Sequence, residues 1–226
     1  PISWGVSEES TFANIKKELQ QLSLNTQLLA VSKLQEIKKI EKLYNLGQRS
    51  FAENYVQEAL DKQSQLSHFK IDWHFIGSIQ SNKAKKLVGN FSLIHSVDSI
   101  KICEVINKAA QETGIKQKIL LQINLAEELT KGGISKAELG KYLELSPAWK
   151  NLEIVGLMTM PPLFENPEEA RPYFRELKEL LASYQQRFPQ LKVLSMGTSS
   201  DYRVAAEEGA TWVRLGTLLF GERPKK

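Results

Sequence analysis

The stretch that decides the fold is Leu191–Gly221, which reads LKVLSMGTSSDYRVAAEEGATWVRLGTLLFG. A short apolar run at Val193–Met196 is followed by a loop of glycine and hydroxyl residues, and then by a helical pattern from Asp201 to Glu208. Gly209 ends that pattern in the role that glycine fills best, and Thr211–Leu215 is a second apolar strand. The order strand, loop, helix, strand, loop is the repeating unit of parallel α/β proteins.

Both loops of this stretch carry small or hydroxyl residues directly after a strand. The first holds Ser199 and Ser200, and the second holds Gly216 and Thr217. Ser200 stands at the predicted N-cap of the short helix, where backbone N–H groups lack intrahelical partners and the helix dipole is positive. Such a helix start is a natural phosphate site. In (β/α)₈ barrels a phosphate site is often formed by the loops after the seventh and eighth strands.

Six earlier strands and their helices complete the series. The predicted strands are Leu28–Ser32, Ser50–Glu53, Trp73–Ile76, Phe91–Val97, Lys118–Leu125 and Ile154–Met158. The predicted helices are Ser10–Leu22, Glu36–Leu46, Tyr55–Leu66, Ser81–Val88, Ser99–Glu112, Ser135–Leu145 and Ala170–Phe188. Short strands that are apolar throughout are typical of parallel strands covered on both faces. The alternation predicts one α/β domain over residues 1–226, a closed (β/α)₈ barrel. An open doubly wound sheet is the alternative, and the missing G-x-G-x-x-G after the first strand speaks against it.

Composition sets broad limits on the function. The 226 residues are 42% hydrophobic and 25% charged, ordinary values for a globular protein, and the net charge of +4 suits an anionic small ligand as well as nucleic acid. The single Cys103 excludes an internal disulfide or a cysteine metal cluster, and its position in a helical pattern predicts a buried apolar residue. The chain shows no signal-peptide pattern and no membrane-spanning run, which predicts a soluble, cytoplasmic protein.

Two cations are expected at the mouth of the predicted barrel, where functional residues gather after the carboxyl ends of the strands. Lys33 follows the first strand and shares a face with Val31, while Arg214 shares a face with Trp212 in the eighth strand. A guanidinium inside a strand needs a polar partner, and no carboxylate precedes Arg214 in its own strand.

A lysine in that position has a specific chemistry available. Partial burial and a neighbouring cation both lower the pKa of an ammonium group, and the resulting amine forms Schiff bases with aldehydes. Pyridoxal 5′-phosphate (PLP) carries both an aldehyde and a phosphate. The residues taken alone also allow a plainer interpretation, in which Lys33 is a solvated loop residue, the hydroxyls form ordinary turns and His74 is a core histidine.

Five longer segments of the chain resemble one known family. They are Ala30–Lys33 (AVSK), Phe51–Glu58 (FAENYVQE), Trp73–Lys83 (WHFIGSIQSNK), Gly156–Met160 (GLMTM) and Ser195–Tyr202 (SMGTSSDY), with Val213–Gly216 and Phe220–Gly221 as shorter matches. Together they resemble the PLP homeostasis proteins, the YggS/PROSC family, over nearly the whole chain. The chain departs at Ala52, where the family usually has glycine, and at Thr198, where methionine is common; neither change removes a polar group.

The resemblance implies a barrel similar to the N-terminal domain of alanine racemase. It also implies PLP held as an aldimine on Lys33, no established enzymatic reaction, and a role in vitamin B6 and amino-acid homeostasis. The phosphate would be held by Ser199, Ser200, Gly216 and Thr217. Arg214 would face the pyridine nitrogen and keep it unprotonated, Asn54 and His74 would line the other side of the ring, and Met196 would pack under it. The candidates for a rim that admits or releases the ligand are Glu53, Lys83 and Lys131.

Three classes of function compete at this point. The favoured one is a non-catalytic, monomeric PLP carrier or regulator, with PLP-dependent apoenzymes as candidate recipients. The second is a slow single-domain racemase or aminotransferase. In alanine-racemase-like enzymes a second base comes from a separate domain of the partner subunit, which we expect this chain to lack because it ends soon after the eighth strand. The third, less favoured, is a nucleic-acid binder that uses the basic segment Lys83–Lys86.

Overall fold

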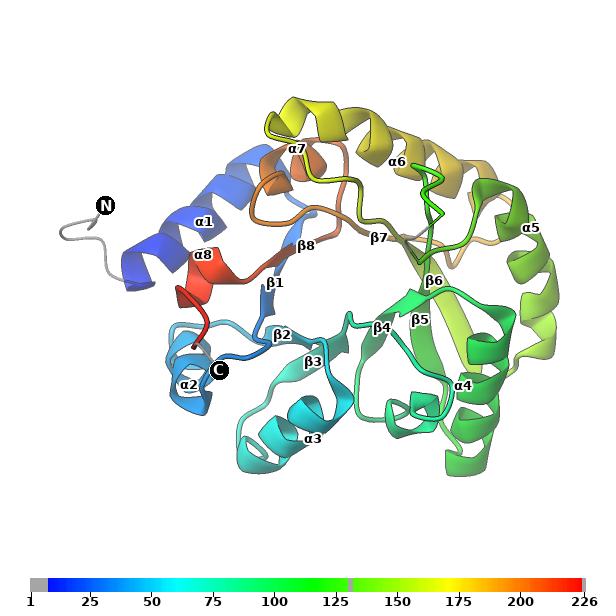
Figure 1. Cartoon of the computed structure of the whole chain (residues 1–226), viewed down its shortest axis with the longest axis horizontal. Helices are drawn as coiled ribbons and strands as arrows, with labels where there is room; N and C mark the ends of the chain where they lie inside the picture. Colours follow the sequence, from blue (N-terminus) through cyan, green and yellow to red (C-terminus); the bar gives the residue numbers. More distant parts are fainter. Residues whose placement is uncertain (1–7, 130–131, 225–226) are drawn as a thin grey trace.

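The strands close into one parallel barrel in the computed structural model, which describes residues 8–129 and 132–224 (Figure 1). Neighbours pair in sequence order, and β1 pairs with β8 to close the ring. The strands are β1 Gln27–Val31, β2 Ser50–Glu53, β3 Asp72–Phe75, β4 Leu93–Val97, β5 Gln117–Gln122, β6 Leu152–Met158, β7 Val193–Ser195 and β8 Trp212–Leu215. The closed ring confirms the predicted (β/α)₈ barrel, and the open sheet is wrong.

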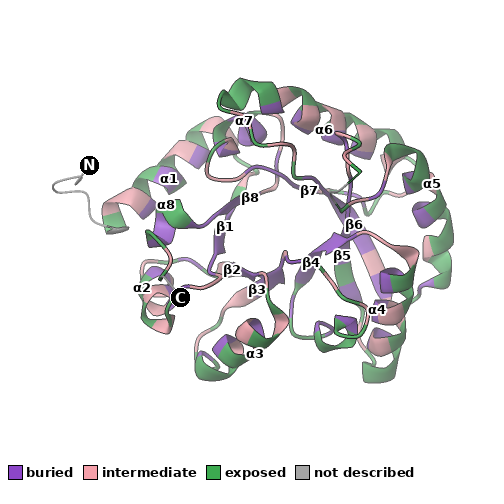
Figure 2. Ribbon diagram, in the orientation of Figure 1, coloured by how far each residue is buried: buried purple, intermediate pink, exposed green. Residues whose placement is uncertain are grey.

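Helices surround the barrel, and Figure 2 shows their buried faces turned towards the strands and their exposed faces turned outwards. The α-helices are α1 Glu8–Leu22, α2 Ile37–Asn45, α3 Val56–Gln65, α4 Ile100–Thr113, α5 Lys136–Leu145, α6 Arg171–Gln185, α7 Tyr202–Glu207 and α8 Thr217–Phe220. Three short 3₁₀ turns accompany them, η1 Ala84–Lys86, η2 Ser146–Ala148 and η3 Pro167–Ala170. Within the described part of the chain, no helix has the length and apolarity to cross a membrane.

Strand alternation divides the core into an outer layer and a barrel interior. The outer layer packs strand residues such as Leu28 and Ala30 against the helices, and it contains the buried Cys103 as predicted. Burial raises the pKa of the Cys103 thiol to about 12, so it acts as an apolar residue. The interior holds two smaller apolar clusters, one around Leu29 and Val31 and one around Leu93 and Leu120. Leu29 pairs in register with Arg214, which places the arginine inside the barrel.

Local sequence signals explain several helix ends. The Ser99 hydroxyl accepts a hydrogen bond from the Ile102 amide at 3.1 Å and begins α4. Gly114 ends the same helix with φ +69°, a left-handed conformation that glycine adopts without strain. Ser135 begins α5 in the same way, by accepting from the Glu138 amide.

The predicted basic helix Ser81–Val88 is wrong. Only η1, Ala84–Lys86, is helical there, and the flanking residues form turns. Ala84 and Leu87 are both buried, a spacing of three residues that suits the tighter 3₁₀ turn. The lysines of this segment are exposed, so it is a solvated turn on the surface.

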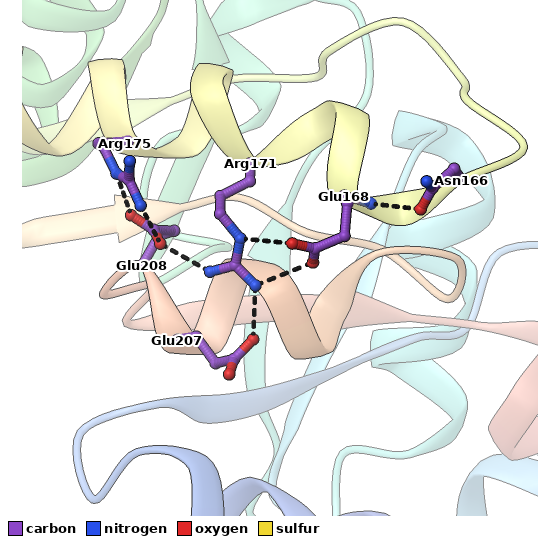
Figure 3. A network of polar contacts seen from close by, with 6 residues as sticks. All are labelled: Asn166, Glu168, Arg171, Arg175, Glu207 and Glu208. Atoms are coloured by element: carbon purple, nitrogen blue, oxygen red, sulfur yellow. Dashed lines mark hydrogen bonds and ion pairs between the residues drawn. The ribbon is translucent and has the colours of Figure 1, made fainter.

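An ion-pair network fastens α7 to the start of α6 (Figure 3). Arg171 bonds to Glu168 and Glu207 at 2.9 Å and to Glu208 at 2.7 Å, and Arg175 reaches Glu208 at 3.0 Å. Individual pairs of this exposure contribute only about 0–1 kcal/mol, but a network on one arginine restrains the geometry of both helices. The network therefore restrains the C-terminal end of α7, the short helix that follows the loop with Ser199 and Ser200.

Candidate functional site

Lys33 lies in a tightly held loop after β1. The side chain is half-buried, and the next residue, Leu34, has φ +62°, a left-handed conformation that leucine rarely adopts. The Leu34 amide donates to a carboxylate oxygen of Glu58 on α3 at 2.7 Å, which stabilises this turn. The loop that presents the Lys33 amine is therefore fixed by a carboxylate from the neighbouring β/α unit.

A buried ionic cluster lies directly behind this loop. Lys62 Nζ donates to the Ser32 carbonyl at 2.6 Å and forms ion pairs with Glu53 at 3.0 Å and Glu58 at 2.5 Å. The Ser32 hydroxyl donates to Glu53. Burial raises the pKa of the Glu53 carboxyl to about 7, although Lys62 acts to lower it. Glu53 is fully buried, so the prediction that it forms part of a rim is wrong; it supports the Lys33 loop from inside.

The pKa of Lys33 is lowered from its ordinary value. Burial is the main cause and the positive charge of Arg223 is the second, while Glu58 acts in the opposite direction. A lowered pKa leaves more of the amine in its unprotonated, nucleophilic form. The lowered pKa agrees with the prediction from the sequence, but the neighbouring cation is Arg223 and not the predicted Arg214.

Arg223 is a site residue that sequence reasoning missed. A Cβ added to Gly216 would lie 3.3 Å from its Nη2 atom and 3.4 Å from the Val31 carbonyl oxygen, so the guanidinium lies against the ends of β8 and β1. The sequence offers no local signal for it, because Arg223 lies two residues beyond Gly221, after the last apolar run.

Arg214 is 4% exposed and lies inside the barrel near its mouth. It donates to the Ser195 hydroxyl at 2.6 Å and to the Thr159 carbonyl at 3.3 Å. Burial lowers the pKa of the guanidinium to about 10, with the Asp201 carboxylate acting against this, so Arg214 remains charged at neutral pH. Among residues 8–129 and 132–224, no carboxylate lies within ion-pair distance of it.

A cavity of about 460 Å³ opens at the mouth beside Arg214. Gly197, Thr198 and Asp201 line it on the side of α7, and Ile76, Met160 and Leu163 supply apolar surface. Its volume falls within the range of small-molecule sites, which combine apolar walls with a few polar groups. The barrel mouth thus offers room for a ligand next to the buried cation.

The hydroxyl-rich loops differ from the sequence expectation by one residue. Asp201, and not Ser200, is the N-cap of α7, and its carboxylate accepts from the Thr198 amide at 2.7 Å. Ser200 is exposed and Ser199 is half-buried in the preceding turn. Thr217 is exposed at the start of α8, and Gly216 is the buried N-cap of that helix. The Asp201 side chain makes no cap hydrogen bond to α7, because its carboxylate turns back to the Thr198 amide, and this turn is what the sequence alone did not show.

Two predicted site residues lie elsewhere. His74 is buried inside the barrel, where it bonds to His95 and Asp72, and it borders a cavity at the opposite end from Arg214's mouth. Met196 is fully buried among helix-facing residues, because Ser195 takes the inward position on β7. The structure therefore brings neither side chain to the mouth. Lys83 is exposed on the surface, and Lys131 lies outside the described residues.

Asn54 follows β2 and is held close to β3. A Cβ on Gly77 would lie 1.9 Å from the Asn54 carbonyl oxygen, so this approach requires glycine at position 77. The buried Asn54 Oδ1 and Arg223 Nε atoms have no hydrogen-bond partner in the described structure. Buried polar atoms without partners are rare in proteins, and both belong to residues beside the mouth.

Comparison with known proteins gives one consistent family. The model of the alanine racemase N-terminal domain matches residues 6–224. The pyridoxal phosphate homeostasis protein of Aquifex aeolicus is 46% identical over 197 residues, which cover 87% of this chain and 86% of the relative. The one from Synechocystis is 45% identical over 201 residues, or 88% of this chain and 92% of the relative.

Solved structures agree with these relatives. PipY of Synechococcus elongatus, solved with PLP bound, is 40% identical with a TM-score of 0.87, covering 95% of this chain and 100% of PipY. The alanine racemase of Clostridium difficile, in complex with cycloserine, has a TM-score of 0.78 at 15% identity. It is matched over 96% of this chain and 59% of its own length, and it shows a common fold only.

Proposed function

This chain belongs to the pyridoxal phosphate homeostasis proteins, whose barrel is that of the alanine racemase N-terminal domain, and we propose that it binds PLP in intracellular vitamin B6 and amino-acid homeostasis. The observation that carries the proposal is the placement of Arg223. Its guanidinium lies against Gly216 and adds positive charge beside the half-buried Lys33 amine. An amine and an anion-binding group side by side match a ligand that carries an aldehyde and a phosphate.

The residues at the mouth fit such a ligand. Two buried polar atoms there, Asn54 Oδ1 and Arg223 Nε, have no partner in the part of the protein that is described. The Arg223 guanidinium and the start of α8 after Gly216 both favour negative charge. The cavity beside Arg214 leaves room for a ring. PLP, when bound, supplies an aldehyde that condenses with amines and a phosphate that anchors the ring.

We assign the following roles to this chain's residues. Lys33 Nζ would supply the amine that condenses with the aldehyde, with loss of water. Arg214 would donate towards the pyridine nitrogen, and Asn54 would flank the ring. Ser199, Ser200, Gly216, Thr217 and Arg223 would hold the phosphate. His74 and Met196 leave this set, since neither reaches the mouth.

Arg214 supports a role without efficient catalysis. A guanidinium has only donors and keeps its protons at neutral pH, so it holds the pyridine nitrogen in its unprotonated form. An unprotonated ring nitrogen stabilises carbanions poorly, and carbanion stabilisation is what PLP supplies to enzymes. We therefore propose a carrier or regulator rather than a racemase.

The first prediction concerns the phosphate. Ser200→Ala and Thr217→Val should each weaken PLP binding about tenfold, because a hydrogen bond to a charged group contributes about 1.5–3 kcal/mol. Equilibrium titration of each variant with PLP, and with pyridoxal, measures the effect. Ser183→Ala, a hydroxyl on the exposed face of α6, is the matched control and should bind as the parent does. Equal affinity of the parent for PLP and pyridoxal would show that these loops are ordinary turns.

The second prediction concerns turnover. Amino acids incubated with the PLP-loaded protein should show no racemisation near a kcat/KM of about 10⁴ M⁻¹s⁻¹, the lower end for ordinary enzymes. Chiral chromatography of each common amino acid measures this, with Lys33→Ala as the control. Racemisation in that range that disappears in Lys33→Ala would make the protein a single-domain racemase and end the carrier proposal.

The third prediction concerns assembly and delivery. We propose that the protein is a monomer that passes PLP to PLP-dependent apoenzymes. Met160 and Leu163 are exposed apolar residues beside the cavity, and a small apolar patch of this kind suits transient contacts with other proteins. Sedimentation velocity at rising protein concentration should give one species of about 26 kDa, since the chain mass is 25.6 kDa. A concentration-dependent shift to twice that mass would contradict the monomer.

A further inference from the structure

A chain of hydrogen bonds runs through the barrel interior, starting from Arg214. Its Nη1 bonds to Ser195 Oγ at 2.6 Å, and Ser195 Oγ lies 2.7 Å from His95 Nδ1. His95 Nε2 lies 2.9 Å from His74 Nδ1, and His74 Nε2 lies 2.9 Å from Asp72 Oδ2. We call these five residues the interior relay. Its members come from β8, β7, β4 and β3, so it crosses the barrel.

The interior relay connects the two ends of the barrel. Ser195 and both histidines are buried, and Arg214 opens towards the mouth. The Asp72 side chain is 39% exposed and borders, with His74, a cavity of about 540 Å³ at the far end. Ser50 and Ser92 also donate to the Asp72 carboxylate, which fixes it in place. Trp212 packs edge-on against His74, with ring centroids 4.7 Å apart.

One arrangement of the hydrogens satisfies every group of the interior relay with both imidazoles neutral, and it is the one we infer. A guanidinium only donates, so Ser195 Oγ accepts from Arg214 and gives its own hydrogen to His95 Nδ1. His95 then carries its hydrogen on Nε2 and donates to His74 Nδ1, and His74 Nε2–H donates to Asp72. Every group is used once, with both imidazoles neutral. Burial is the largest cause that holds the pKa of His95 well below its ordinary value, and the charge of Arg214 acts in the same direction, in agreement with a neutral His95 ring.

The interior relay explains how the buried Arg214 is stabilised without a carboxylate beside it. Hydrogen bonds in series polarise one another, most strongly where water is excluded. The Asp72 carboxylate stays ionised: burial acts to raise its pKa, but hydrogen bonds from His74, Ser92 and Ser50 keep it below its ordinary value. The charges that face Arg214 are thus Asp201 at the mouth and, through the relay, Asp72.

We propose that His95 is a positioning residue: through Ser195 it orients the Arg214 guanidinium towards the ligand's ring nitrogen and links it to the Asp72 carboxylate at the far end of the barrel. This rests on the proposed function, because the ring nitrogen is that of PLP. His95 does not touch the ligand; it acts only through Ser195 and Arg214. His74, which the sequence placed at the ring, is part of the same relay.

The first arm of the test needs no ligand. The chain has 3 histidines, so ¹⁵N-histidine NMR of the protein without PLP gives few signals, and His68→Gln removes the surface one. His95 and His74 should both be neutral and protonated at Nε2. A His95 protonated at Nδ1, or a doubly protonated His95 at pH 7, would overturn the relay whether or not the protein binds PLP.

The second arm measures the relay's effect on bound PLP. His95→Leu interrupts the relay and should weaken PLP binding about tenfold, with the covalent label still on Lys33. The pH midpoint of the bound ligand's absorbance change should fall, because the positive guanidinium is no longer linked to Asp72. Asp72→Asn, at a half-exposed position, removes the charge and keeps one oxygen as the acceptor for His74, while the new amide group faces Ser92, whose hydroxyl can accept from it. It should lower the midpoint with little loss of affinity.

The outcomes of these measurements distinguish the positioning role of His95 from the proposed binding of PLP. His68→Gln, a histidine variant on the surface, should match the parent in affinity and midpoint. A midpoint unchanged in both His95→Leu and Asp72→Asn would overturn the positioning role while leaving PLP binding intact. If His95→Leu does not fold, Asp72→Asn and the NMR tautomers still decide the question. Failure of the parent to bind PLP would refute the proposed function alone, since the relay is tested without ligand.

Discussion

Lys33→Ala is expected to abolish covalent attachment of PLP. The half-buried Lys33 amine has a lowered pKa, which raises the share of its nucleophilic form, and it lies in a loop fixed by Glu58, which defines its position. The purified parent protein should be yellow. Borohydride reduction followed by peptide mapping should place the pyridoxyl group on Lys33, and the variant should carry essentially none.

Lys83→Ala is the matched control, because Lys83 also follows a β strand but is exposed on a surface turn. Exposed amines react with free PLP only reversibly and without a phosphate site beside them, so this variant should keep the full label. A label found mainly on Lys83 or Lys131 in the parent protein would contradict the assignment of Lys33.

Lys62→Met is expected to lower the free energy of unfolding by about 3–5 kcal/mol at pH 8, where the Glu53 carboxyl is ionised. Lys62 is the only cation paired with the buried Glu53 carboxylate in the described ranges, and removing it leaves that carboxylate uncompensated. Urea denaturation measures the loss. Lys101→Met, an exposed lysine on α4, should change stability by less than about 0.5 kcal/mol. If both variants lose the same small amount, the buried cluster does not stabilise the fold.

The loss of unfolding free energy in Lys62→Met should also depend on pH, in a defined direction. The pKa of Glu53 is raised to about 7 in the folded protein from 4.5, so the folded state holds an extra proton between these values. Stability linked to Glu53 is therefore highest below that window and falls as the pH rises through it. The deficit of Lys62→Met should accordingly be larger at pH 8 than at pH 5. Glu53→Gln, introduced together with Lys62→Met, should recover much of the loss and remove this pH dependence.

Much of the fold could be predicted from the sequence because the signals are local. Apolar runs locate the strands within about three residues, and the serine before α4 and the glycine after it mark that helix's ends. Ser81–Val88 failed because its basic residues fit a helix and a turn equally well, and only the burial of Ala84 and Leu87 decides between them.

The site was less predictable because it depends on which face each strand turns inwards. Lys33 and Arg214 could be placed from alternation around Val31 and Trp212. Met196 could not be placed, because the strand before it is only three residues long. Ser195 points into the barrel, so the neighbouring Met196 points outwards to the helices. The partnership of His74 with His95 links strands that are separate in sequence. Arg223 could be found only from the closure of the ring, which brings the last segment beside β1.

The conformation of Leu34 has a consequence for how the mouth orders. A leucine in the left-handed region costs roughly 1–2 kcal/mol, and an unfolded chain seldom visits that region. The loop that carries Lys33 is therefore ordered by its contacts with Glu58 and Lys62 and against its own backbone preference. Such a segment opens at a lower free energy than the strands around it, as locally unfolding units do. A ligand that binds only when this loop is closed stabilises the closed loop by its binding free energy. Occupancy of the mouth is then expected to show in the local order of this single turn.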